Sequence, residues 1–158
     1  MNIVFWMDPP EFINVKKDTS YALIHECIAR KHTVFYASKT AFSIQDNQLN
    51  CLAYKCKPFA FGEPIQINNE PNNLTDADID ACWIRCDPPF DIDYLNHMWM
   101  LHQFSSTIHF MNSPSGILST NEKMVIHQFP SIIPQTLVTK SVTDIHQFAS
   151  NFQSIILK

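Results

Sequence analysis

Two apolar segments of this chain stop at the same tripeptide, Asp-Pro-Pro. Residues 2–7 lead directly into Asp8 and its two prolines, and residues 81–85 lead, one residue later, into Asp87 and its two prolines. Proline has no backbone N–H to give to a sheet and does not fit the interior of a helix, so neither segment can continue. Short, nearly unbroken apolar runs of this kind predict strands that are buried on both faces, as in a parallel sheet.

The stretch after the first apolar run predicts a helix and then a second strand. Residues 18–20 (Asp-Thr-Ser) are typical N-cap residues, and apolar residues recur at helical spacing from Tyr21 to Ile28. Residues 33–37 then form a β-prone run. Strand, helix and strand in this order favour a parallel sheet with residues 2–7 as a central strand.

The rest of the chain predicts further alternation of strands and helices, with no internal repeat. We expect a hairpin of residues 41–45 and 49–56 at the sheet edge, and then a surface loop over residues 57–80 with one short strand at 64–67. A helix over 91–104 and a strand over 107–111 follow, and a capping box of Ser119 and Glu122 opens a helix from Asn121 to Pro130. The last expected elements are a strand over 135–139, a helix over 143–149 and a strand over 155–158. This order predicts an α/β fold with a mainly parallel sheet and an edge hairpin.

Charge and hydropathy exclude two classes of partner. The net charge is −4, and lysine and arginine are scattered along the chain, so we expect no nucleic acid partner. No apolar run approaches the roughly 20 residues that span a membrane, and we expect the five-residue apolar run Ile3 to Met7 to be too short for a signal peptide. The composition therefore predicts a soluble, cytoplasmic protein with no membrane partner.

Cysteine and glycine usage narrows the chemistry further. The five cysteines are odd in number and form no CxxC pair, which favours reduced thiols in a core over disulfides or a metal site. Gly62 and Gly116 are the only glycines, whereas loops that cradle phosphates need several. A Walker loop and a dinucleotide fingerprint are therefore excluded. No serine or cysteine lies in a nucleophile motif, so no catalytic residue is assigned.

The two Asp-Pro-Pro loops predict a binding rim. Ligands of open α/β sheets bind outside the carboxyl ends of the strands, and Asp8 and Asp87 both follow strand ends. Arg85, just before Asp87, is suited to anchor a substrate carboxylate, because its fork of donors matches two oxygens. The alternative is a structural ion pair of Arg85 with Asp87 or Asp91.

The start of the first helix is a second candidate site. Lys16, Lys17, Asp18 and Ser20 gather where free N–H groups and the helix dipole favour an anion. Ordinary capping accounts for Asp18 and Ser20 equally well. It does not account for the two lysines, which oppose the dipole and so suggest a nearby anion.

Two further lysines are candidates for contact with phosphate. Lys123 is expected in the first turn of a helix, where a cation is unfavourable without an anionic partner. Lys158 follows an apolar strand, and an inward-pointing lysine can be held against a phosphate there.

Five ordered motifs resemble those of bacterial glutathione synthetase, and together they cover essentially the whole chain. They are "MDPPEFINVKKDTS" at residues 7–20, "RCDPPFDIDY" at 85–94, "NSPSGILSTNEK" at 112–123, "PQTLVT" at 134–139 and "IILK" at 155–158.

This resemblance implies an ATP-grasp ligase that joins γ-glutamylcysteine to glycine in glutathione biosynthesis, through an acyl phosphate formed with ATP and Mg²⁺. It implies a Rossmann-like pre-ATP-grasp domain over residues 1–120, then a linker helix and the truncated beginning of the ATP-grasp domain over residues 121–158. It also implies that Lys123 and Lys158 contact the ATP phosphates, and that the enzyme is a homo-oligomer.

In the family, the magnesium ligands, the glycine-rich cover and most substrate contacts follow the "ILK" element. We therefore expect this chain alone to be inactive and to bind neither ATP nor Mg²⁺ by itself. Its expected partner is the missing C-terminal ATP-grasp half.

Two departures from the family leave alternatives open. Cys86 stands where family members often carry a basic residue, which leaves one cation fewer at the rim, and the downstream half is missing. The chain could instead be a short binding or assembly module derived from such a domain. A third possibility is a different ligase that shares the pre-ATP-grasp fold.

Overall fold

A sheet built around the first apolar segment organises the N-terminal part of the chain. In the computed structural model, which describes residues 1–87, 89–121 and 123–157, this sheet has six strands in the order β4-β3-β2-β1-β5-β6. The strands are β1 (Asn2–Met7), β2 (Thr33–Gln45), β3 (Gln48–Lys55), β4 (Asn72–Thr75), β5 (Ala81–Arg85) and β6 (His109–Met111).

The predicted sheet type is confirmed. Strand β1 pairs in parallel with β2 on one side and with β5 on the other, and β5 pairs in parallel with β6. Strands β2 and β3 form the predicted antiparallel hairpin. Its turn residues Asp46 and Asn47 both have positive φ, at 51° and 62°, which suits the tight turns that match the twist of two strands.

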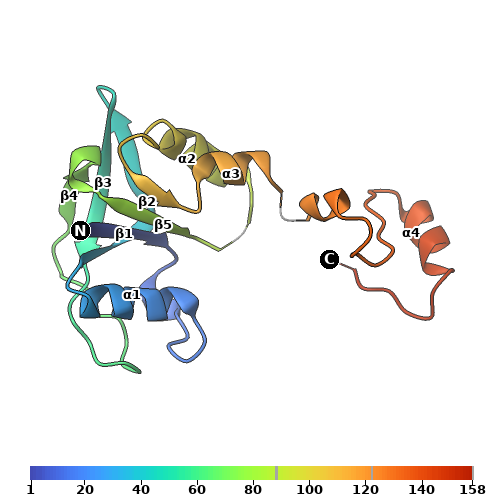
Figure 1. The fold of residues 1–158 in the computed structure, drawn as a ribbon, viewed down its shortest axis with the longest axis horizontal. Coiled ribbons are helices and arrows are strands. Elements are labelled where there is room, and N and C mark those ends of the chain that lie inside the picture. Colours follow the sequence, from blue (N-terminus) through green and yellow to red (C-terminus); the bar gives the residue numbers. More distant parts are fainter. Residues whose placement is uncertain (88, 122, 158) are drawn as a thin grey trace. The chain divides into compact units, whose positions relative to one another are not determined.

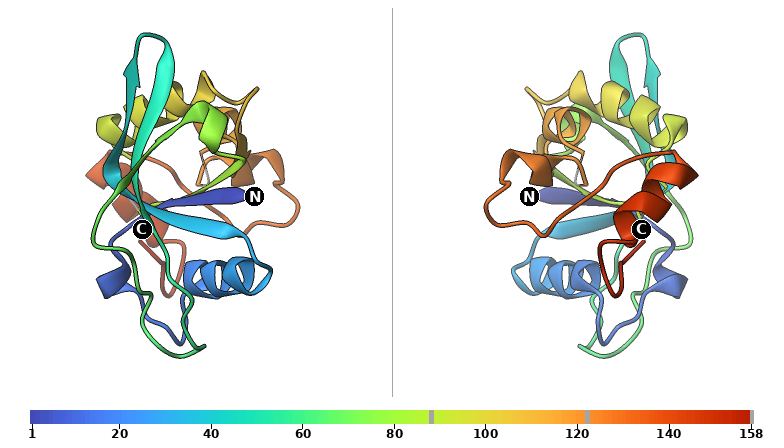
Figure 2. Two further views of the ribbon diagram at one scale, coloured as in Figure 1. Left: turned by 90° about the vertical axis from the view of Figure 1, so that its left-hand side faces the viewer. Right: turned by 90° about the vertical axis from the view of Figure 1, so that its right-hand side faces the viewer.

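Helices cover both faces of this sheet. Helix α1 (Thr19–Ala29) lies on one face, and α2 (Ile92–His102) and α3 (Pro114–Ser119) lie on the other, as the views in Figure 1 and Figure 2 show. Asp18 and Asp91 cap α1 and α2, because each side chain accepts backbone N–H groups of the first turn. Short 3₁₀ turns occupy Pro10–Phe12 and Asp76–Asp78.

Alternation along β1 divides the core into two layers. Val4 and Trp6 pack in the cluster that includes α2 and α3 side chains, whereas Ile3, Phe5 and Met7 pack in the cluster that includes Ile24 of α1. All five side chains are buried. This is the two-sided burial that the unbroken apolar run predicts.

Residues 120–158 form a second compact unit, and the first spans residues 1–119. It contains a 3₁₀ turn at Val125–Gln128 and the helix α4 (Val142–Ala149), whose N-cap Ser141 accepts the backbone N–H of Asp144. The helix expected over residues 143–149 is therefore confirmed.

Several expectations are wrong in the part of the chain that the structure describes. The helix from Asn121 to Pro130 is reduced to the short 3₁₀ turn, and residues 135–139 and 155–157 form no strand. A strand needs a hydrogen-bonded neighbour, and the described residues of the second unit supply none. Glu122 of the expected capping box and Lys158 lie outside the described residues.

Two elements of the first unit are missed by sequence reasoning. Strand β4 has the sequence Asn-Asn-Leu-Thr, which is poor in residues that favour strands, and it forms because it pairs with β3. It lies at the edge of the sheet where the hairpin was expected to be the last element. Helix α3 begins at Pro114 in a Pro-Ser-Gly sequence typical of loops. Proline is nevertheless well suited to the first turn of a helix, where its missing N–H has no partner to lose.

The loop before β4 is held against α1. The Tyr21 hydroxyl donates to the backbone oxygen of Glu63 at 2.8 Å and accepts the backbone N–H of Gly62 at 2.7 Å.

The strand expected at residues 64–67 is limited to a single bridge between Cys56 and Ile67. In the described residues no helix has the length and apolar character needed to cross a membrane.

We predict that Leu49→Ala lowers the free energy of unfolding by about 2–5 kcal/mol, the usual cost of a buried leucine truncation. The matched control is Leu52→Ala on the same strand, because Leu52 is 49% exposed whereas Leu49 is fully buried. Urea unfolding of both variants measures the difference. Equal losses would contradict the assignment of Leu49 to the core.

The buried thiols give the fold a dependence on high pH. All five cysteines are free, and burial raises the pKa of Cys51 and Cys56 to about 12. Burial also raises the pKa of Cys82. Above about pH 9 the unfolded chain loses thiol protons that the folded chain keeps, and this favours unfolding.

We therefore predict that the free energy of unfolding falls as pH rises from about 9 towards about 12, by up to about 1.4 kcal/mol per pH unit for each buried thiol. Urea unfolding of the wild type and Cys51→Ala across this range checks it. The variant should show the shallower fall, and Cys27→Ala, at a half-buried position, should change the slope less. A slope that is the same in wild type and Cys51→Ala would contradict the assignment.

Candidate functional site

The carboxyl ends of β1 and β5 form one rim, as the sequence predicts for the two Asp-Pro-Pro loops, and they lie beside the point where β2 leaves its parallel pairing with β1. Trp6 of β1 is in register with Ala37 of β2 and with Ile84 of β5. Asp8 lies two residues beyond Trp6, and Lys39 lies two residues beyond Ala37. The register of the strands therefore brings Asp8 and Lys39 to the same level of the sheet.

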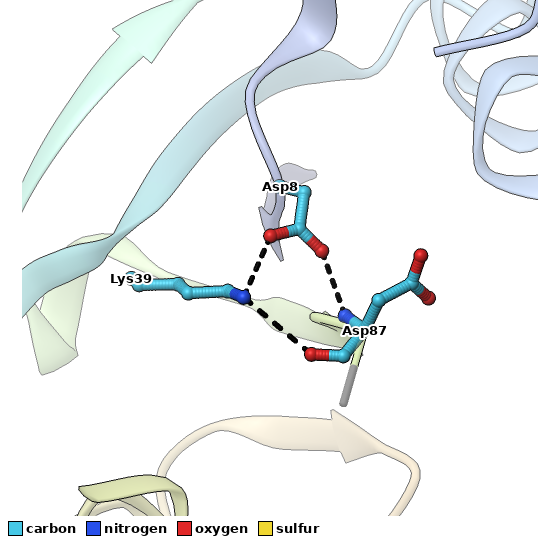
Figure 3. A network of polar contacts seen from close by, with 3 residues as sticks. All are labelled: Asp8, Lys39 and Asp87. Atoms are coloured by element: carbon cyan, nitrogen blue, oxygen red, sulfur yellow. Dashed lines mark hydrogen bonds and ion pairs between the residues drawn. The ribbon is translucent and has the colours of Figure 1, made fainter. Parts of the chain in front are cut away.

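Asp8, Lys39 and Asp87 form a polar network at this rim, which we call the Lys39 network (Figure 3). The Lys39 ammonium forms an ion pair with Asp8 Oδ1 at 2.7 Å. The backbone N–H of Asp87 donates to Asp8 Oδ2 at 2.8 Å, and Lys39 Nζ donates to the backbone oxygen of Asp87 at 3.4 Å. The two Asp-Pro-Pro loops are thus joined through one carboxylate and one lysine.

Arg85 extends to the opposite side of the sheet from this ion pair. Its Nε donates to the hydroxyl of Ser20 at 2.9 Å, and Ser20 is buried in the first turn of α1. The alternative pairs with Asp87 or Asp91 are not among the contacts of the described residues. Arg85 is itself exposed.

The N-terminus of α1 already has an anion, because it is capped by its own acid. Asp18 Oδ1 accepts the backbone N–H groups of Ser20 at 2.6 Å and of Tyr21 at 3.2 Å. Lys16 and Lys17 are exposed in the loop before the helix and form no ion pair within the part of the chain that the structure describes. The structure therefore brings Arg85, Asp18 and Ser20 together, and leaves the two lysines at the surface.

Electrostatics at the rim follow from these contacts. The hydrogen bond to Asp8 raises the pKa of Lys39, which keeps its ammonium charged. Burial raises the pKa of the Cys86 thiol to about 12, and the neighbouring charge of Asp8 adds to the effect. Cys86 is therefore a protonated, half-buried side chain that packs against the cluster containing Trp6. It has the character of a packing residue.

Lys39 is the rim residue that sequence reasoning missed. Because Cys86 stands where family members often carry a basic residue, the sequence predicts one cation fewer at the rim. Lys39 supplies a cation there from β2, the strand next to β1. A signal exists in the sequence: the polar triplet Ser38-Lys39-Thr40 interrupts the apolar strand just beyond residues 33–37. Because this triplet follows a predicted parallel strand, it falls at the same edge as Asp8.

The second unit carries a separate groove of about 1050 Å³. Lys123 lines it, together with apolar side chains from the turn after it, from α4 and from the final residues; these include Met124, Ile126, Val138, Phe148, Ile155 and Leu157. The side chain of Asn121 accepts the backbone N–H of Lys123 at 2.9 Å, which orders the chain entering the groove. Lys158, the other predicted phosphate contact, lies outside the described residues.

A metal site is not evident in the described part of the chain, where no group of three or more His, Cys, Asp and Glu side chains could hold an ion. The carboxylates of Asp8 and Asp18 are engaged with Lys39 and with backbone N–H groups, respectively.

Two family models match the chain in succession. The model described as "Prokaryotic glutathione synthetase, N-terminal domain" matches residues 1–117, and the one described as "Prokaryotic glutathione synthetase, ATP-grasp domain" matches residues 122–158. The first match alone covers more than half of the chain.

Curated relatives agree with these matches. The chain is 29% identical to the glutathione synthetase of Buchnera aphidicola subsp. Baizongia pistaciae, over 100% of the chain and 49% of that protein. It is also 29% identical to the glutathione synthetase of Nitrosomonas europaea and 27% identical to that of Brucella melitensis, in each case over 100% of the chain and 51% of the relative. The chain thus spans about half the length of the curated relatives it matches.

A solved structure shares the fold. The crystal structure of the macrocyclase MdnC bound with precursor peptide MdnA, from Microcystis aeruginosa MRC, matches with a TM-score of 0.53 and 17% identity, over 97% of this chain and 51% of that one. Ordered motifs, a mainly parallel sheet and two consecutive family matches agree: the chain belongs to the prokaryotic glutathione synthetase family.

Proposed function

We propose that this chain is the N-terminal half of a glutathione synthetase, an ATP-dependent ligase that joins γ-glutamylcysteine to glycine. The observation that carries this proposal is the succession of the two family matches, over residues 1–117 and 122–158, on a chain that is half the length of its relatives. In the ligase reaction the cysteinyl carboxylate takes the γ-phosphoryl group of ATP. The amine of glycine then displaces phosphate from the acyl phosphate.

The domain division proposed for this role is a pre-ATP-grasp domain over residues 1–120 and the beginning of the ATP-grasp domain over residues 121–158. The separation of the chain into units 1–119 and 120–158 supports it.

The proposed substrate rim consists of Arg85, Asp87 and the start of α1. Arg85 is exposed, is fixed through Nε by Ser20, and is therefore oriented to bind a carboxylate of γ-glutamylcysteine with its terminal nitrogens. Asp18 has a supporting role, since it caps the turn that holds Ser20. Lys16 and Lys17, exposed just before that turn, add positive potential that attracts an anionic peptide.

Lys123 is proposed to contact the phosphates of ATP, with Lys158 as its predicted partner. In support, Lys123 lines a groove whose other walls are mainly apolar, which suits a flat base beside a charged phosphate. Phosphoryl transfer depends on stabilising phosphate charge and on positioning, which lysines supply. ATP and Mg²⁺ are the cofactors proposed for the full-length enzyme.

We predict that the purified chain makes no glutathione from γ-glutamylcysteine, glycine and ATP, because the family's remaining ATP-grasp region is absent from this sequence. Measuring glutathione and ADP by chromatography checks this. The complete Nitrosomonas europaea enzyme, run alongside, shows that the assay detects product. Glutathione formed by the chain alone would contradict the prediction.

We predict that Arg85→Ala weakens binding of γ-glutamylcysteine to this chain by about tenfold or more, since a charged hydrogen-bonded contact is lost. Titration followed by amide shifts in nuclear magnetic resonance measures the affinity. Arg30→Ala is the matched control, because Arg30 is an exposed arginine at the C-cap of α1 that pairs with Glu26. Unchanged affinity in Arg85→Ala would rule out the carboxylate-anchor role.

A further inference from the structure

The Lys39 network leaves one of its two acids without a partner for its side chain. Asp8 is neutralised by Lys39 and also accepts the backbone N–H of Asp87. Asp87 enters the network only through its backbone, with its N–H and its carbonyl oxygen. Within the described residues its carboxylate makes no hydrogen bond or ion pair, and Figure 3 shows it turned away from Lys39 and Asp8.

A cation and this free acid follow each other along one strand end. Arg85 is the last residue of β5, and Asp87 comes two residues later. Arg85 bonds to Ser20 on the α1 side, whereas Cys86 packs in the cluster on the α2 and α3 side. Arg85 and Asp87 carry opposite charges and do not pair with each other in the described structure, so each remains available to a ligand.

The backbone of β2 is adapted to bring Lys39 into the network. The register of β2 with β3 shifts between Ala37 and Phe42, which marks a bulge at residues 38–41. A bulge redirects side chains relative to a regular strand. Lys39 lies inside this bulge and reaches Asp8 across the edge of the parallel sheet.

We propose that Lys39 is a positioning residue, which holds Asp87 in place through Asp8. Asp87 then binds the α-ammonium group of the substrate, and Arg85 binds the adjacent carboxylate. This inference rests on the proposed function, because γ-glutamylcysteine carries such a zwitterion at its γ-glutamyl end. Lys39 performs two tasks: it neutralises Asp8, and it binds the carbonyl oxygen of Asp87, which fixes the peptide that carries the acid.

The test compares two ligands on the whole 158-residue chain. One is γ-glutamylcysteine and the other is N-glutarylcysteine, which keeps the carboxylates but lacks the α-ammonium group. We expect the wild type to bind γ-glutamylcysteine about tenfold more tightly, the value of one good charged contact. Lys39→Met should lose most of this preference, and Asp87→Asn should lose it as well.

Two controls separate positioning from general effects. Lys39→Arg retains a cation that can pair with Asp8 and should keep the preference. Lys55→Met removes an exposed lysine of β3, opposite Phe35, that has no part in the Lys39 network, and it should leave the preference unchanged. Hydrogen exchange of the Asp87 amide gives a readout without ligand. It should speed up several-fold in Lys39→Met, because its acceptor Asp8 loses the ion pair that orients it.

The outcomes distinguish this inference from the function on which it rests. If the wild type binds neither ligand, the proposed substrate rim is wrong and the role of Lys39 falls with it. If the wild type binds both equally, or Lys39→Met keeps the tenfold preference, the Lys39 proposal alone is overturned. Should Lys39→Met fail to fold by circular dichroism, Asp8→Asn breaks the same ion pair and is judged by the same criteria.

Discussion

The parallel pairing of β1 with both β2 and β5 is the constraint on which the rest of the N-terminal unit depends. Because β1 is central, its side chains must be apolar on both faces, and this brings one layer of core against α1 and another against α2 and α3. The same pairing sets the ends of β1 and β5 beside the point where β2 leaves the parallel pairing, at Ala37. Asp8 and Lys39 then meet at this edge, and Arg85 reaches Ser20 of α1, without any loop having to cross a large distance.

Elements that depend on local signals were predicted well from the sequence. Strand β1 and helix α1 are examples: an apolar run stopped by two prolines and a helical repeat opened by Asp18 each carry their own boundary signals. Elements that depend on partners were not. Strand β4 is polar and exists through its pairing with β3, and the apolar residues 155–157 form no strand because no described neighbour pairs with them.

The same distinction applies to the candidate site. Arg85, Asp87 and Asp18 could be predicted because motif and position along the chain mark them. That Arg85 bonds to Ser20, 65 residues away in the sequence, follows only from the packing of α1 on the sheet. Lys39 was missed for a related reason, since its role depends on the bulge in β2 that carries it and on an acid contributed by another strand.

The Tyr21 hydroxyl gives the loop before β4 an influence beyond its own segment. It both donates to Glu63 and accepts from Gly62, so this loop is attached to the residue that directly follows Ser20. Ser20 in turn holds Arg85. Local opening of the loop would therefore remove two hydrogen bonds from Tyr21, the neighbour of the residue that supports the arginine. The order of a surface segment some 40 residues away along the chain becomes part of what keeps the rim ready for a ligand.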